Sequence, residues 1–253
     1  VLASIHHVCE TKISMNRLND KESKSNVPVQ PTFRWVMLVL MSLLYGCFGL
    51  AVASISPLVG SISLDLSINS SQMGTILGAW QLVYIGLAYQ SGSLLDRFGI
   101  KRSVAAGATA IALSLFMRAI SVDFVTLLLA VVIFGVGGSM ISVGSPKVAG
   151  IWFRGRQRGM ATSVSFAGSI LGSVIGVACT NSIVVPVLGH WRLAFFLYGT
   201  VTVVATLIWI VFAKDQILPI ESSNDSDKKH QGKLKEIITI NNVKLIVVLG
   251  FSV

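Results

Sequence analysis

Residues 35–59 read WVMLVLMSLLYGCFGLAVASISPLV, a block of 25 residues without any Asp, Glu, Lys or Arg. At about 1.5 Å per residue, an α-helix of this length crosses a hydrocarbon core of roughly 30 Å. The block does not alternate polar and apolar residues, as a membrane β-strand would. It therefore predicts a membrane-spanning helix.

Five further blocks have the same character, and only the second is interrupted by a charge, Arg118: 70–95, 103–122, 124–146, 159–189 and 193–213. Across the chain, 53% of the residues are hydrophobic and 12% are charged, whereas soluble domains carry about a quarter charged residues. The composition excludes a disordered chain and argues against a soluble domain. The sequence predicts an all-α membrane protein with a six-helix bundle at 35–213.

Basic residues predict the orientation of this bundle. Of the 20 Lys and Arg, 18 lie in 1–34, 96–102, 147–158 and 214–244. Because each helix crosses the membrane once, these four segments all lie on the same side of it. Because basic loops stay on the cytoplasmic side, we expect a cytoplasmic N-terminus in the cell membrane. The net charge of +9 mostly reflects this asymmetry, and no basic stretch carries the interleaved aromatic residues of a nucleic-acid surface.

The segments outside the bundle predict a divided protein. Residues 1–34 read as a cytoplasmic tail, in which 1–14 precede Met15 and are either upstream sequence or not native. Residues 214–244 read as a cytoplasmic inter-domain loop, and 245–253 as the start of a seventh helix. We therefore expect a missing C-terminal half to be a partner, besides the lipid bilayer and a small-molecule substrate.

Metal and cofactor chemistry has little support. Cys47 and Cys179 fall in apolar blocks and act there as small apolar residues. His6, His7 and Cys9 provide fewer than the four ligands of a closed zinc site. We expect no metal and no cofactor.

The loop between the second and third predicted helices reads Gly92-Ser-Leu-Leu-Asp96-Arg97-Phe98-Gly99-Ile100-Lys101-Arg102. It resembles the signature loop of the major facilitator superfamily (MFS), in which Gly, three residues, Asp, a basic residue, any residue and Gly precede a basic cluster. The segments 151–161 and 191–199 resemble the family's fourth loop and the start of its sixth helix. The resemblance implies the N-terminal six-helix half of an MFS transporter.

The resemblance also assigns roles to this loop. Asp96 would be the acid of a cytoplasmic gate, and Gly92 and Gly99 would allow the tight reversal. The basic residues of the gate motif would be Arg97, Lys101 and Arg102, and its partners across the loop Arg154 and Arg158. The alternative is an ordinary positive-inside turn in which Asp96 is solvated.

In the family, the first, second, fourth and fifth helices line a central cavity. The polar and aromatic candidates on these helices are Tyr45, Gln81, Tyr84, Ser142 and Asn181. Gln81 and Tyr84 are three residues apart and so share a helix face. Gly168, Gly172 and Gly176 form a face of small residues, which we assign to helix packing that permits movement.

Charges and departures from the family pattern narrow the function. Val131 stands where multidrug antiporters carry an Arg, and the Gly-Pro pattern of their fifth helix is missing. No Asp or Glu lies inside the predicted spans, so they hold no carboxylate for proton coupling. We expect Arg118 to snorkel to the headgroups. Lys147, at the inner end of the fourth predicted helix, could attract an anion at the cavity mouth, and the positive-inside bias explains it equally well.

These observations predict a secondary transporter of a small solute, with a lean towards an organic or inorganic anion, working by alternating access. One alternative is a non-transporting receptor or sensor on the same scaffold. The other is a six-helix intramembrane enzyme. That alternative needs a Gly-x-Ser-x-Gly turn and an intramembrane His, but the turn is missing and His190 lies at a helix end. We therefore expect no enzymatic activity.

Overall fold

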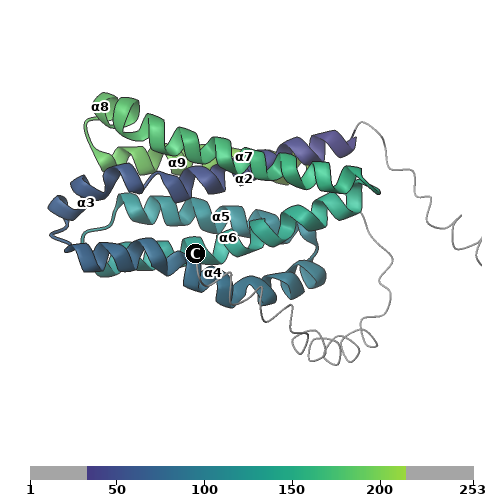
Figure 1. The fold of residues 1–253 in the computed structure, drawn as a ribbon, viewed down its shortest axis with the longest axis horizontal. Coiled ribbons are helices and arrows are strands. Elements are labelled where there is room, and N and C mark those ends of the chain that lie inside the picture. The colour runs from purple at the N-terminus through teal and green to yellow at the C-terminus, as the bar shows by residue number, and fades with distance from the viewer. Residues whose placement is uncertain (1–32, 215–253) are drawn as a thin grey trace, which may run out of the picture. The chain divides into compact units, whose positions relative to one another are not determined.

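The computed structural model describes residues 33–214 as a bundle of long helices (Figure 1). The expected tail at 1–34, apart from its last two residues, lies outside the described residues. So do the expected loop at 214–244, apart from Lys214, and the expected helix start at 245–253.

Six long helices form the bundle, and they are listed with the short elements between them: α2 (Phe33–Ala53), η1 (Ser56–Leu58), α3 (Val59–Asp65), α4 (Ser70–Phe98), α5 (Ile100–Ala119), α6 (Phe124–Trp152), α7 (Gln157–Cys179), η2 (Thr180–Val184), α8 (Val185–Leu188) and α9 (Trp191–Phe212). No strand occurs between residues 33 and 214. The prediction of an all-α membrane fold is confirmed.

Local sequence explains where the helices begin and end. The apolar block 35–59 is not one helix, because Pro57 lacks an N–H and disrupts the turn before it, so α2 stops at Ala53. Asn69 caps α4 by accepting a hydrogen bond from the backbone N–H of Gln72, and Gln72 accepts one in return. Asp123 caps α6 through the backbone N–H of Thr126.

Within the described residues, five stretches are long and apolar enough to cross a membrane: Phe33–Asp65, Ile100–Ala119, Phe124–Trp152, Gln157–Leu188 and Trp191–Phe212. The helix α4 is not among them, although its 29 residues exceed the length required. It carries Gln72, Gln81 and Gln90, which lower its apolar character. A helix that contributes polar groups to an internal pocket is expected to have this composition.

The helices pack as two connected groups. α2 packs against α7 and α9, and α6 packs against α4 and α5; contacts of α5 with α9 and of α2 with α6 join the groups. Phe134, Phe195 and Trp209 are fully buried among them.

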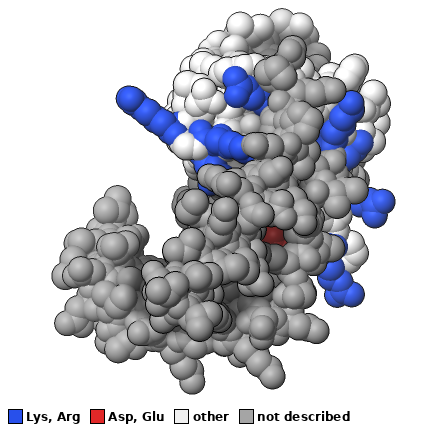
Figure 2. Space-filling view, turned by 90° about the vertical axis from the view of Figure 1, so that its right-hand side faces the viewer, with Lys and Arg blue, Asp and Glu red and all other residues white. Residues whose placement is uncertain are grey.

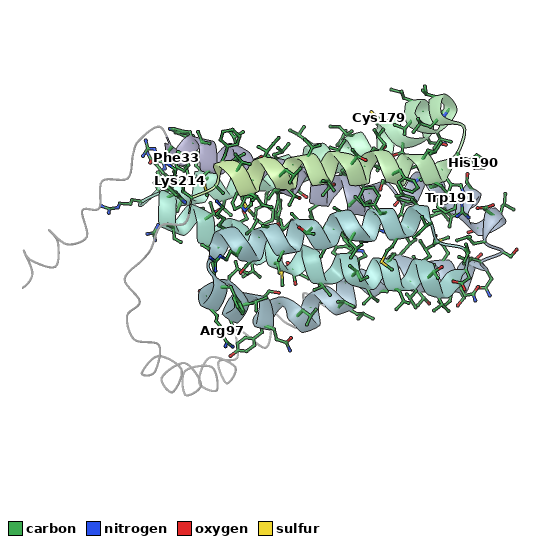
Figure 3. All side chains as sticks on the ribbon, turned by 180° about the vertical axis from the view of Figure 1, so that it is seen from behind. Phe33, Arg97, Cys179, His190, Trp191 and Lys214 are labelled. Carbon is green, nitrogen blue, oxygen red and sulfur yellow. The ribbon has the colours of Figure 1, made fainter. Side chains whose placement is uncertain are left out.

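Most described basic residues lie at one end of the bundle, which we call the basic end. Figure 3 places Phe33, Arg97 and Lys214 at this end and Cys179, His190 and Trp191 at the other. Figure 2 views the basic end and shows Lys and Arg spread around it. The other basic residues near this end are Arg34, Lys101, Arg102, Lys147, Arg154, Arg156 and Arg158, towards the ends of α2, α5, α6 and α7.

Candidate substrate pocket

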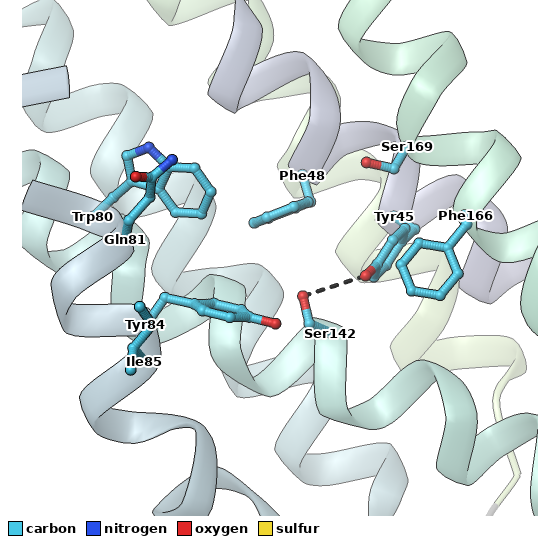
Figure 4. A pocket seen from close by; sticks show the side chains of 9 residues that line it. All are labelled: Tyr45, Phe48, Trp80, Gln81, Tyr84, Ile85, Ser142, Phe166 and Ser169. Atoms are coloured by element: carbon cyan, nitrogen blue, oxygen red, sulfur yellow. Dashed lines mark hydrogen bonds between the residues drawn. The ribbon is translucent and has the colours of Figure 1, made fainter. Parts of the chain in front are cut away.

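A pocket of about 410 Å³ opens between α2, α4, α6 and α7 (Figure 4). Its volume falls in the range of small-molecule sites. The lining residues are Tyr45, Phe48, Trp80, Gln81, Tyr84, Ile85, Ser142, Phe166 and Ser169. None of them carries a formal charge.

The structure brings together four of the five residues that the sequence suggested for the cavity. Tyr45 and Ser142 face each other from α2 and α6, and the Tyr45 hydroxyl donates a hydrogen bond of 3.3 Å to Ser142 Oγ. Gln81 and Tyr84 line the opposite side from α4. Asn181 does not line this pocket: it lies in η2, a π-helical segment beyond the end of α7, and is exposed.

Several aromatic pocket residues were not anticipated from the sequence. Phe48 lies three residues after Tyr45, and Trp80 directly precedes Gln81, so helical spacing could have suggested both. Phe166 contacts Tyr45 edge-on, with ring centroids 5.2 Å apart. These side chains look like ordinary apolar residues of a membrane helix in the sequence, and only the packing shows that they face a cavity.

A cluster of stacked rings forms one wall of the pocket. The rings of Phe48 and Phe134 are parallel within 11°, with centroids 5.4 Å apart. Trp80 meets both edge-on, at 6.1 Å from Phe48 and 5.7 Å from Phe134. Ring contacts of this kind contribute about 0.5–1.5 kcal/mol each beyond burial, so they stabilise this wall of the pocket.

Arg118 lies behind this wall, and the expectation that it snorkels to the headgroups is wrong. Arg118 is 2% exposed, and its Nη1 donates a hydrogen bond of 2.8 Å to the carbonyl oxygen of Ala51. The guanidinium carbon lies 4.9 Å from the ring centre of Phe134. The rotation of α5 about its axis points Arg118 into the bundle.

The signature loop makes a different ion pair from the expected one. Lys147 Nζ donates 2.7 Å to Asp96 Oδ1 and 2.9 Å to the carbonyl oxygen of Gly92. Lys147 thus ties the end of α4 to α6, in the place expected for Arg154 and Arg158. Because a carboxylate near the C-terminus of a helix opposes the helix dipole, a lysine there offsets both Asp96 and the terminal carbonyls.

The other residues of the motif lie around this contact. Arg97 stacks over Phe98, and Gly99 joins α4 directly to α5 with φ 83°. The Lys101 carbonyl accepts a hydrogen bond of 3.0 Å from Trp209 Nε1, and Arg102 is exposed near the start of α5. Arg158 follows the short loop after α6, and its Nε donates 2.9 Å to the carbonyl of Phe153.

The small-residue face of α7 lies directly against α2. Gly168, Gly172 and Gly176 approach the α2 backbone so closely that a Cβ atom on Gly172 would collide with the Gly46 carbonyl. Ser173 Oγ donates 3.2 Å to the carbonyl oxygen of Gly49 across this contact. Since Tyr45 is on α2 and Phe166 and Ser169 are on α7, this close packing sets the width of the pocket.

An ion pair at the end opposite the basic end joins three segments. Arg192 Nη2 donates 2.8 Å to Asp65 Oδ2, and Arg192 Nη1 donates 2.8 Å to the carbonyl oxygen of Ser121. The contact holds the end of α3 and the α5–α6 loop against the start of α9.

Comparisons with known proteins agree with this arrangement. A sequence model described as Major Facilitator Superfamily matches residues 41–253. A hexuronate transporter of Bacillus subtilis is 26% identical over 152 residues, which cover 60% of this chain and 36% of that protein. A galacturonate transporter of Dickeya chrysanthemi is 25% identical over 182 residues, which cover 72% of this chain and 52% of the relative.

An uncharacterized MFS-type transporter, EfpA of Mycobacterium tuberculosis, is 32% identical over 139 residues, covering 53% of this chain and 25% of that protein. The chain thus spans between a quarter and about half of these three relatives. The crystal structure of the peptide transporter POT superposes with a TM-score of 0.60 at 15% identity, covering 85% of this chain and 44% of that one. The matched family model and the shared helical fold show that this multi-pass membrane chain belongs to the Major Facilitator Superfamily.

Proposed function

We propose that this chain forms one half of a secondary transporter that works by alternating access, and that its pocket binds a small organic anion of the sugar-acid type. The observation that carries the proposal is the pocket itself, where hydrogen-bonding side chains and aromatic rings converge from α2, α4, α6 and α7. Transporter sites commonly lie near the bilayer midplane between two halves. The hexuronate and galacturonate transporters among the relatives support the ligand class.

The lining chemistry supports a hydroxyl-rich ligand. The hydroxyls of Tyr45, Tyr84 and Ser142 and the amide of Gln81 can donate or accept hydrogen bonds. The faces of Phe48 and Trp80 offer flat apolar surface beside them. A pocket that is mostly apolar with a few convergent polar groups is typical of small-molecule sites.

Lys147 no longer supports an anionic ligand. Its ammonium group is engaged by the Asp96 carboxylate and the Gly92 carbonyl, so it offers little free charge to a substrate. The ligand class therefore rests on the relatives and on the pocket.

The same contact supports a proposal for the gate. Asp96, Lys147 and Gly92 hold the ends of α4 and α6 together, and we propose that this clasp stabilises one state of the transport cycle. We place the protein in the plasma membrane with its basic end facing the cytoplasm, since basic loops are retained on that side. Under this proposal α2 begins on the cytoplasmic side.

Transport of sugar acids in proteoliposomes tests the proposal. The protein is expressed from its complete coding sequence, reconstituted, and assayed for uptake of radiolabelled glucuronate and galacturonate, with glucose as the neutral comparison. We expect saturable uptake of at least one sugar acid. Binding without flux would favour the receptor alternative, and neither binding nor flux would refute the ligand class.

Two matched tyrosine substitutions test whether uptake depends on the pocket. Tyr45→Phe removes the hydroxyl that bonds Ser142, and we expect the KM for the sugar acid to rise about three- to tenfold, the effect of one hydrogen bond. Tyr89→Phe is the matched control, because Tyr89 lies on α4, is 74% exposed and does not line the pocket. Equal effects of the two substitutions would contradict the assignment.

A further inference from the structure

Arg118 carries a buried positive charge that no carboxylate in the described structure neutralises. Between residues 33 and 214, the ion pairs join Asp96 to Lys147 and Asp65 to Arg192, and Arg118 takes part in neither. Its Nη1 bonds the Ala51 carbonyl, whereas its Nε is buried without a hydrogen-bond partner. Because a guanidinium stays protonated even when buried, the charge remains on the side chain.

The position of this charge relates it to the pocket. The guanidinium lies over the Phe134 ring, and Phe134 stacks in turn on Phe48, whose ring faces the pocket (Figure 4). Phe134 lies about 15 Å along α6 from Phe124, well inside the bundle. Arg118 therefore reaches from the last turn of α5 to the back of the aromatic wall.

A charge in this position influences the pocket without touching its ligand. The lining residues carry no formal charge, and protein and lipid screen a charge far less than water does. We propose that Arg118 sets a positive potential in the pocket and is the residue that determines its preference for anions. The inference rests on the proposed function for the identity of the ligand site, but the potential can be measured without transport.

Capping of α2 is a second consequence of the same geometry. The Ala51 carbonyl belongs to the last turn of α2, where the helix dipole is negative and carbonyls lack helical partners. This role explains the direction of the side chain. If Arg118 only capped α2, substitutions of Arg118 would change stability and leave the potential in the pocket unaffected. A measurement of the potential therefore separates the two roles.

The measurement uses a thiol in the pocket. In the protein from the complete coding sequence, Cys9, Cys47 and Cys179 are replaced by alanine and Ser169→Cys is introduced, which leaves the Tyr45–Ser142 bond intact. The thiol is modified with two methanethiosulfonate reagents, an anionic one that carries a sulfonate and a cationic one that carries a trimethylammonium group. Each rate is divided by the rate at which the same reagent modifies a small free thiol in solution. The ratio of the two normalised rates reports the local potential.

The ratio is compared in Arg118, Arg118→Lys and Arg118→Gln backgrounds. The ring centre of Phe134 lies 4.9 Å from the guanidinium and 5.4 Å from the ring centre of Phe48, which lines the pocket. At roughly 12 Å, with an effective dielectric constant between that of protein, about 20, and that of water, about 80, a unit charge favours a monovalent anion over a monovalent cation on the order of tenfold. We expect Arg118→Gln to lower the ratio by about this factor and Arg118→Lys to keep most of it. Ser93→Cys, exposed towards the basic end of α4, is the control, at which Arg118→Gln is expected to change nothing.

Three results would overturn the inference. The first is an unchanged ratio at Ser169→Cys when Arg118 becomes Gln, and the second is an equal change at Ser93→Cys. The third applies even if Arg118→Gln does not fold: with Arg118 intact, the pocket thiol reacts no faster with the anionic reagent than with the cationic one. A failure of sugar-acid uptake alone would refute the ligand class and leave the potential standing.

Discussion

Gly172→Ala is expected to force α2 and α7 apart, because the added methyl group has no room. An ideal Cβ atom on Gly172 lies 2.7 Å from the carbonyl carbon and 3.0 Å from the Cα of Gly46, and closer still to its oxygen. Carbon atoms in favourable contact are about 3.5–4.0 Å apart. The colliding atoms belong to the backbone, so no side chain can rotate away, and the helices must separate by about 1 Å.

The separation has a cost that follows from the contacts along these helices. A gap of about 0.5–1 Å removes a quarter to a half of the attraction between facing atoms. The hydrogen bonds from Ser42 Oγ to Val164 O, at 3.3 Å, and from Ser173 Oγ to Gly49 O, at 3.2 Å, would also lengthen beyond bonding range. Overpacking costs about 1–3 kcal/mol, and we expect the upper part of this range, about 2–3 kcal/mol.

Thermal unfolding of the purified protein in detergent measures this cost. About 2–3 kcal/mol corresponds to a fall in Tm of roughly 5–10 °C for a chain of this size or larger. Gly176→Ala should cost less, because the nearest atom to its added Cβ, Leu50 O, is 3.0 Å away. Gly159→Ala on the same helix is the control, since its Cβ would meet nothing within 4 Å.

The order of the Tm values of these variants tests whether the contact between α2 and α7 is as close as the structure shows. If Gly172→Ala melts with the wild type, the close contact of α2 and α7 is not what the structure shows. Alanine favours a helix more than glycine does, so Gly159→Ala should not lose stability. If it loses as much as Gly172→Ala, the steric reasoning is refuted.

Three further outcomes follow from single contacts. Lys147→Ala should change the free energy of unfolding by less than about 1 kcal/mol, because the Asp96 side chain is 76% exposed. It should nevertheless lower the rate of uptake at equal amounts of protein. A loss of stability that matches the loss of uptake would contradict the proposed gate. Asp65→Asn removes the ion pair with Arg192 and should cost less than about 1 kcal/mol, because the Asp65 side chain is 44% exposed. Thermal unfolding measures this cost, and a fall in Tm as large as that of Gly172→Ala would contradict the exposed position of the pair. Gly99→Ala should cost about 1–3 kcal/mol in thermal unfolding, because φ 83° and ψ 157° suit only glycine, and an unchanged Tm would argue against this backbone conformation.

The sequence by itself determined the fold class and the number of long helices. Apolar blocks longer than the bilayer is thick have few folded alternatives, because unpaired backbone groups are too costly in lipid. The signature loop from Gly92 to Arg102 then indicated the family, and family knowledge indicated the helices that line the cavity. Four of the five suggested side chains line the pocket. For two of them, Gln81 and Tyr84, helix spacing alone predicts a shared face.

Tertiary structure decided which partner each polar side chain finds. Arg118 lies in the last turn of α5, as a snorkelling residue would, but the rotation of α5 directs it to Ala51 and Phe134. Asp96 had several cations nearby in sequence, and the crossing of α4 and α6 selected Lys147. A periodic pattern fixes the length and apolar character of a helix, whereas its rotation and its neighbours depend on side chains distant in the chain.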